Sequence, residues 1–141
     1  MTPEEEAEFV ARFKCRLFTG DIDGTFTGGG CFYFAIRAFN RGIGTLHYSG
    51  TSGDSKKRGH VFVITENGQA FDHNGYSNPL ALVAKFHGYS GKPPRAISSK
   101  EVEKEILTSP LSKDKELASS IFTLADQIIT EKAKPRHTGS Q

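Results

Sequence analysis

Few residues in this sequence are suited to covalent cross-linking or to membrane insertion. The 141 residues include two cysteines, one methionine and no tryptophan. Two cysteines are too few for a disulfide framework, and neither lies in a CxxC pair or a metal-ligand cluster, so we expect both to be reduced thiols. No run approaches the roughly 20 apolar residues of a membrane-spanning helix. The N-terminal segment MTPEEEAEF is acidic, whereas a signal peptide would be basic and then apolar, so we expect a cytoplasmic protein with no membrane partner.

Strong charge of either sign is missing as well. The formal net charge of +2 gives no reason to expect nucleic-acid binding. Two basic clusters, SKKRG at 55–59 and KAKPRH at 132–137, are typical of a solvated loop and of a frayed chain end. Length and composition instead indicate one globular domain that buries its core without disulfides or metals. We place this domain at residues 1–134 and a disordered tail at 135–141, and leave the oligomeric state open.

Capping residues and apolar periodicity predict where the helices and strands lie. A capping box with proline at the first helical position predicts a helix over about 3–18, followed by a loop over 19–30. A second helix should begin at or just before Cys31 and end at Gly42 as a left-handed C-cap. The other expected elements are strands at 44–49 and 95–97, a hairpin at 60–72, and helices at about 78–88, from 98 onward and at 112–132. This order favours an α+β domain in which a helix packs on a small antiparallel sheet.

Three glycines stand directly before Cys31, in the segment TGGGCFYFA at 27–35. A cysteine at a helix N-terminus lies among unpaired N–H groups at the positive end of the helix dipole, which favours the thiolate and offers donors to an oxyanion. Gly29 and Gly30 would let a substrate carbonyl approach the backbone there. The alternative is that Cys31 is a small core residue at the end of a loop. Cys15 has no comparable neighbours, and we interpret it as structural.

A catalytic thiolate also needs a proton shuttle, and His60 is the best placed of the five histidines because it opens the most hydrophobic strand. The third member of a triad depends on the hairpin register. A two-residue loop would place Asp72 opposite Val63, pointing away from His60. A three-residue loop at 66–68, with its glycine left-handed, would place Asp72 opposite Phe62 and on the same face as His60.

Each of these residues also has a simpler interpretation. His60 could be a strand-end histidine with satisfied hydrogen bonds, and Asp72 could be the residue that initiates a turn. Asn74 could orient His60 instead of Asp72 if the register slipped by two residues. The segment at 50–59 leads directly into His60, and is either a lid that faces the substrate or a plain connection.

The segments GGGCFYFA, GHVFVI and AFDHNG, in this order, resemble the catalytic core of the papain-like cysteine hydrolases. The layout is most similar to the NlpC/P60 and transglutaminase-like groups, and to small phage and bacterial proteins with a GGCxxFA…HVxV…YDxxG pattern. The resemblance covers about residues 27–76. It implies that Cys31 is the nucleophile, that His60 is the base and acid, and that Asp72 orients His60. It also implies hydrolysis or transfer at an amide, isopeptide or thioester carbonyl of a protein or peptide-like substrate, through a covalent thioester and without a cofactor or metal.

Two other functions compete with the hydrolase. The same fold could serve as a non-catalytic binding module, for example in a phage or mobile-element protein. The segment GDIDGTFT at 20–27 also matches the DxDGT signature of haloacid dehalogenase-like phosphatases, in which Asp21 would be the nucleophile, Asp23 the acid and Mg²⁺ the cofactor. That family needs a hydrophobic strand directly before the first aspartate, whereas here a helical pattern runs almost up to Gly20. We therefore favour the cysteine hydrolase.

Overall fold

The computed structural model describes residues 1–50, 59–85 and 93–133. The expected tail at 135–141 and the interior of the segment at 50–59 lie outside these residues. The described elements are α1 (Pro3–Phe18), α2 (Ile22–Thr27), α3 (Cys31–Asn40), β1 (Thr45–Ser49), β2 (His60–Ile64), β3 (Ala70–Asp72), β4 (Gly75–Ser77), α4 (Pro79–Val83), β5 (Arg95–Ala96), α5 (Ser99–Thr108), the 3₁₀ helix η2 (Pro110–Lys113) and α6 (Lys115–Lys132).

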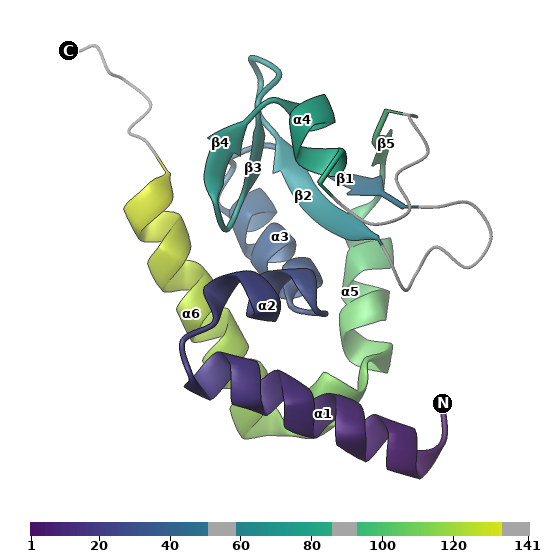
Figure 1. Ribbon diagram of the computed structural model, residues 1–141. Helices are drawn as coiled ribbons and strands as arrows, with labels where there is room; N and C mark the ends of the chain where they lie inside the picture. Colours follow the sequence, from purple (N-terminus) through teal and green to yellow (C-terminus); the bar gives the residue numbers. More distant parts are fainter. Residues whose placement is uncertain (51–58, 86–92, 134–141) are drawn as a thin grey trace.

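A five-stranded antiparallel sheet with helices on both faces forms the centre of the molecule (Figure 1). The strand order is β4-β3-β2-β1-β5. Helix α3 packs on one face of the sheet against β2, and α5 and α6 flank α3 on its two sides. The short α4 covers part of the other face, where Leu82 and Val83 pack against Phe62 and Ala70. The α+β class expected from the sequence is therefore confirmed.

The long helices form where the sequence predicted them. In α1 the Glu5 N–H donates to Thr2 Oγ1 at 3.0 Å, and the Thr2 N–H donates to Glu5 Oε1 at 2.7 Å. Helix α3 begins at Cys31, and the chain leaves it through Gly42 at φ +78°. Within the ranges that the structure describes, no helix is both long enough and apolar enough to cross a membrane.

The β2–β3 hairpin has the three-residue loop. Val63 pairs with Phe71 and Ile64 with Ala70. The loop closes through a hydrogen bond of 2.9 Å from the Gly68 N–H to the Thr65 carbonyl, and Gly68 has φ +86°. Continuing this register by one pair sets Asp72 opposite Phe62, on the same face as His60. The register on which the triad depended is confirmed.

Besides the edge strand β4, which was not expected, two elements differ from the expectation. Residues 22–27 form α2 where a loop was predicted, because the Asp21 carboxylate caps the helix by accepting the Gly24 N–H at 2.9 Å, and Phe26 is fully buried. A six-residue helix containing glycine and two threonines has low intrinsic propensity, so tertiary packing stabilises it. The final helix begins at Lys115 instead of 112, because Pro110 starts a separate 3₁₀ turn and Asp114 caps α6.

Candidate functional site

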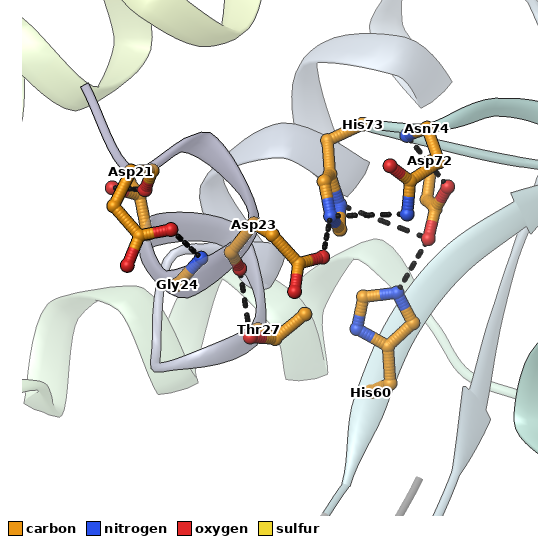
Figure 2. A network of polar contacts seen from close by, with 9 residues as sticks. Asp21, Asp23, Gly24, Thr27, His60, Asp72, His73 and Asn74 are labelled. Carbon is orange, nitrogen blue, oxygen red and sulfur yellow. Dashed lines mark hydrogen bonds and ion pairs between the residues drawn. The ribbon is translucent and has the colours of Figure 1, made fainter. Parts of the chain in front are cut away.

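His60 and Asp72 form a buried ion pair between the start of β2 and the end of β3 (Figure 2). The His60 Nε2 and Asp72 Oδ2 atoms are 3.0 Å apart, and the two residues are only 1% and 2% exposed. A carboxylate accepts hydrogen bonds, so Nε2 carries the proton that it donates to Asp72. The pair therefore fixes the orientation of the imidazole ring and leaves Nδ1 for a second partner.

Cys31, at the first position of α3, is a second side-chain hydrogen-bond partner of His60. The three residues predicted from the sequence thus lie together, although they come from three separate elements. Cys31 is 3% exposed, so the sulfur is covered in this conformation. Cys15, in contrast, is an exposed free thiol on α1.

The electrostatics of the pair favour the charged forms of both partners. Burial by itself lowers the pKa of His60, but the hydrogen bonds to Asp72 and Cys31 and the electrostatic interaction with these two groups outweigh it and raise this pKa to about 9. Burial would raise the pKa of Asp72, but the hydrogen bond and charge of His60, the charge of His73 and the Asn74 N–H lower it below 3.8. Near neutral pH, His60 is therefore an imidazolium and Asp72 a carboxylate.

A second histidine–aspartate pair lies beside the first and was not predicted (Figure 2). His73 is 3% exposed, and its Nε2 lies 2.8 Å from Oδ1 of Asp23, whose side chain is 71% exposed. The other ring nitrogen, Nδ1, lies 3.7 Å from Asp72 Oδ2. Asp72 thus has an imidazole on either side. Strand periodicity gave no signal for this pair, because its partners are 50 positions apart and meet only through α2.

Asn74 does not orient His60, so that alternative is wrong. Its backbone N–H donates to Asp72 Oδ1 at 2.9 Å, and its side-chain nitrogen lies 3.3 Å from His73 Nε2. The register does not slip, because the loop geometry holds Asp72 in line with His60. Asn74 instead holds the carboxylate that contacts both histidines.

The glycines before Cys31 serve contacts within the protein. Gly29 has φ +122°, and a Cβ there would lie 3.1 Å from Phe9 Cζ. A Cβ on Gly30 would lie 2.6 Å from the Thr25 carbonyl oxygen, and the Gly30 N–H donates to that oxygen at 3.0 Å. The Gly30 N–H therefore already has an acceptor within the protein, and the approach of a substrate carbonyl at Gly29 and Gly30 stays a prediction. Donors near the sulfur must come from the first turn of α3, whose N–H groups have no acceptor within the helix.

The phosphatase alternative does not fit the fold. Asp21 caps α2, Asp23 pairs with His73, and the element before them is the helix α1 instead of a strand. The sheet is antiparallel throughout, whereas that alternative required a doubly wound sheet.

Comparison with known proteins adds nothing to these geometric observations. No protein-family model matches the chain, and no curated protein and no solved structure matches it. The functional interpretation therefore depends on the arrangement of the residues described above.

Proposed function

We propose that this protein is a cysteine-dependent hydrolase or acyltransferase with a papain-like core. It acts at an amide, isopeptide or thioester carbonyl, with Cys31 as nucleophile, His60 as acid and base, and Asp72 as the residue that orients His60. One observation carries the proposal. His60 is buried between two hydrogen-bond partners, Asp72, whose Oδ2 lies 3.0 Å from His60 Nε2, and Cys31 at the N-terminus of α3. This is the relation of nucleophile, base and orienting group that covalent acyl transfer requires.

The chemistry follows from these contacts. The Cys31 thiolate attacks the carbonyl carbon and forms a C–S bond, and the first turn of α3 faces the developing oxyanion. The carbonyl re-forms as the bond to the leaving group breaks, and the His60 imidazolium gives its Nδ1 proton to that group. Water or an acceptor nucleophile then loses a proton to His60 and attacks the thioester, which releases the product and the Cys31 thiolate. Asp72 keeps the Nε2–H bond throughout and so holds the ring in place.

The burial of Cys31 favours a second candidate, a binding module with an inert thiol. At 3% exposure, the sulfur meets a substrate only after the side chains that cover it move. Structural cysteines are typically buried in this way, whereas reactive cysteines are at least partly accessible. The two candidates therefore differ in whether Cys31 reacts with a small electrophile while the protein is folded.

Alkylation by iodoacetamide, followed residue by residue across pH in the presence of a chelator, tests the proposal. We expect Cys31 to react well below the ordinary thiol pKa of about 8.5, because His60 stabilises the thiolate. The His60→Ala and His60→Gln variants should slow this reaction about tenfold or more at pH 6–7, since a thiol at its ordinary pKa is mostly protonated there. Cys15 on the exposed surface of α1 serves as the internal reference in every sample.

A matched control is His47→Gln on β1. The His47 ring nitrogen Nδ1 lies 3.0 Å from the Thr45 carbonyl oxygen, away from the triad, so this change should leave Cys31 reactivity unchanged. Circular dichroism checks that each variant is folded. Alkylation of Cys31 only after unfolding, or at equal rates in wild type and both His60 variants, would overturn the hydrolase proposal and favour the binding module.

A further inference from the structure

Three buried side chains with metal-ligand chemistry converge beside the triad. His60, Asp72 and His73 are 1%, 2% and 3% exposed, and one ligand atom from each lies within 4.8 Å of the other two. Asp72 Oδ2 is 3.0 Å from His60 Nε2 and 3.7 Å from His73 Nδ1. In a tetrahedral zinc site with bonds of about 2.0–2.2 Å, neighbouring ligand atoms are about 3.3–3.6 Å apart. The two distances to Asp72 Oδ2 are therefore close to the spacing of neighbouring ligand atoms in such a site, and the third pair of atoms lies within 4.8 Å.

The orientation of His73 supports a ligand on its inner nitrogen. Its Nε2–H donates to the Asp23 carboxylate at 2.8 Å, which orients the ring so that Nδ1 faces Asp72. Nδ1 is buried and has no hydrogen-bond partner among the described residues, yet it faces the Asp72 carboxylate. A buried ring nitrogen that faces a carboxylate at this distance is stable only when a proton or a cation lies between the two groups. Histidines that bind metals typically donate their other N–H to a carboxylate in this way.

The donor set and the charge indicate which cation fits. Two imidazoles and one carboxylate suit Zn²⁺ and similar transition metals, whereas Mg²⁺ and Ca²⁺ prefer oxygen ligands. Asp72 and Asp23 together carry two negative charges, which balance a divalent ion. The Asn74 N–H holds the second Asp72 oxygen at 2.9 Å, so the carboxylate is already oriented.

We propose that His60, Asp72 and His73 bind a divalent cation of the Zn²⁺ class, and that this cation reversibly blocks the triad. The blocking part depends on the proposed function, whereas the binding part does not. Nε2 of His60 cannot hold both the metal and the proton that it shares with Asp72, so binding releases that proton and breaks the hydrogen bond. Without its Nε2 proton the ring no longer carries the imidazolium charge that stabilises the Cys31 thiolate in the proposed function, and with Nδ1 protonated it cannot accept a proton from the thiol.

Titration of the metal-free full chain with Zn²⁺, in competition with a chromophoric zinc chelator, tests binding. We expect one Zn²⁺ per chain. His73→Gln removes a ligand and should weaken binding about tenfold or more, and Asp23→Asn should weaken it about ten- to a hundredfold by freeing the His73 ring. The Asp23 side chain is 71% exposed, so Asp23→Asn should leave the core intact. This variant therefore still tests the site if His73→Gln fails to fold. His47→Gln is the matched control and should bind as tightly as wild type. Equal affinity in all four proteins would overturn the site.

Cys31→Ser shows whether the sulfur is a ligand. It should retain zinc, because the proposed set does not include Cys31. Loss of binding in Cys31→Ser together with full binding in His73→Gln would assign the ion to Cys31 and His60 and would overturn the proposal. In wild type, zinc should slow the alkylation of Cys31, and the zinc concentration that halves the rate should equal the concentration that half-saturates the site. In His73→Gln, halving the rate should require about tenfold more zinc.

The two proposals fail in different ways. A reactive, His60-dependent Cys31 in a protein that binds no zinc overturns the metal site and leaves the hydrolase proposal in place. Stoichiometric zinc binding that His73→Gln weakens, in a protein whose Cys31 is inert without metal, supports the metal site and overturns the hydrolase proposal.

Discussion

At the scale of single residues, Asp72 is the centre of the site. One carboxylate oxygen accepts the His60 proton, the other accepts the Asn74 N–H, and His73 lies beside the first. A buried carboxylate with these partners is stable as an anion, and its charge is one reason that the pKa of His60 is raised to about 9. In the proposed mechanism, the chemistry of Cys31 therefore depends on a residue that acts only through His60.

Asp72→Asn should preserve the shape of this residue and remove its charge. We expect a loss of about 1.5–3 kcal/mol in the free energy of unfolding, the range for a hydrogen bond to a charged group. The pH profile of Cys31 alkylation should move to higher pH, because the imidazolium that stabilises the thiolate loses its partner. Urea denaturation and alkylation across pH measure the two effects.

Asp126→Asn is the matched control for that substitution. Asp126 pairs with Arg37 at 2.6 Å in a partly exposed position, so the change should cost less than about 1 kcal/mol and leave the alkylation profile unchanged. An Asp72→Asn profile that coincides with wild type would contradict the role of Asp72 as the orienting residue.

The sequence was informative for residues whose neighbours follow from local rules. Strand alternation and a glycine in the loop were enough to align His60 with Asp72. The pairing of His73 with Asp23 could not be predicted in this way, because it depends on a helix that tertiary packing stabilises. The close contact of Gly30 with Thr25 could not be predicted for the same reason, since Thr25 belongs to that helix.

At the scale of elements, α2 sets the position of the helix that carries Cys31. The chain turns from α2 into α3 within three residues, 28–30, and the Gly30 N–H bonds back to the Thr25 carbonyl at 3.0 Å. The same helix presents Asp23 to His73. Helix α2 therefore connects both histidine–aspartate pairs to the N-terminus of α3.

Gly30→Ala tests this connection. The added Cβ would lie 2.6 Å from the Thr25 carbonyl oxygen, so α2 and α3 must separate. We expect a loss of about 1–3 kcal/mol in stability, typical of overpacking, and slower alkylation of Cys31 at neutral pH as its helix end shifts away from His60. Thermal or urea unfolding and alkylation rates provide the two readouts.

Gly42→Ala, at the other end of α3, is the control. A Cβ there meets nothing within 4 Å, so the cost is the left-handed backbone strain of about 1 kcal/mol, and Cys31 should react as in wild type. Equal effects of the two substitutions on Cys31 reactivity would show that global destabilisation, and not the position of α3, controls the sulfur.

At the scale of the whole molecule, the fold brings together groups from three distant parts of the chain. Helix α3 packs on β2, and the β2–β3 hairpin supplies the histidine and the aspartate (Figure 1). The α+β class and the hairpin were predictable because they follow from local periodicity and turn chemistry. The short edge strand β4 was not predicted, because its three residues gain their pairing only from β3.

The buried pair should also make the stability of the whole molecule depend on pH. The pKa of Asp72 is lowered from 3.8, so its contribution is present above about pH 4 and is lost as pH falls through the lowered value. The pKa of His60 is raised from 6.5 to about 9, so its contribution is complete below pH 6.5 and is lost as pH rises to about 9. Burial raises the pKa of Tyr33 to about 12, so this group stays neutral throughout that range.

We therefore expect the free energy of unfolding of the metal-free protein to be highest between about pH 4 and 6.5, and to fall toward pH 9 with a slope of at most about 1.4 kcal/mol per pH unit. Urea denaturation at a series of pH values, with a chelator present, measures this slope. His60→Gln cannot release a proton on unfolding, so its slope should be much shallower over the same interval. Stability that rises above pH 6.5 in wild type, or that falls equally in the variant, would mean that His60 is not held as an imidazolium by Asp72 and Cys31.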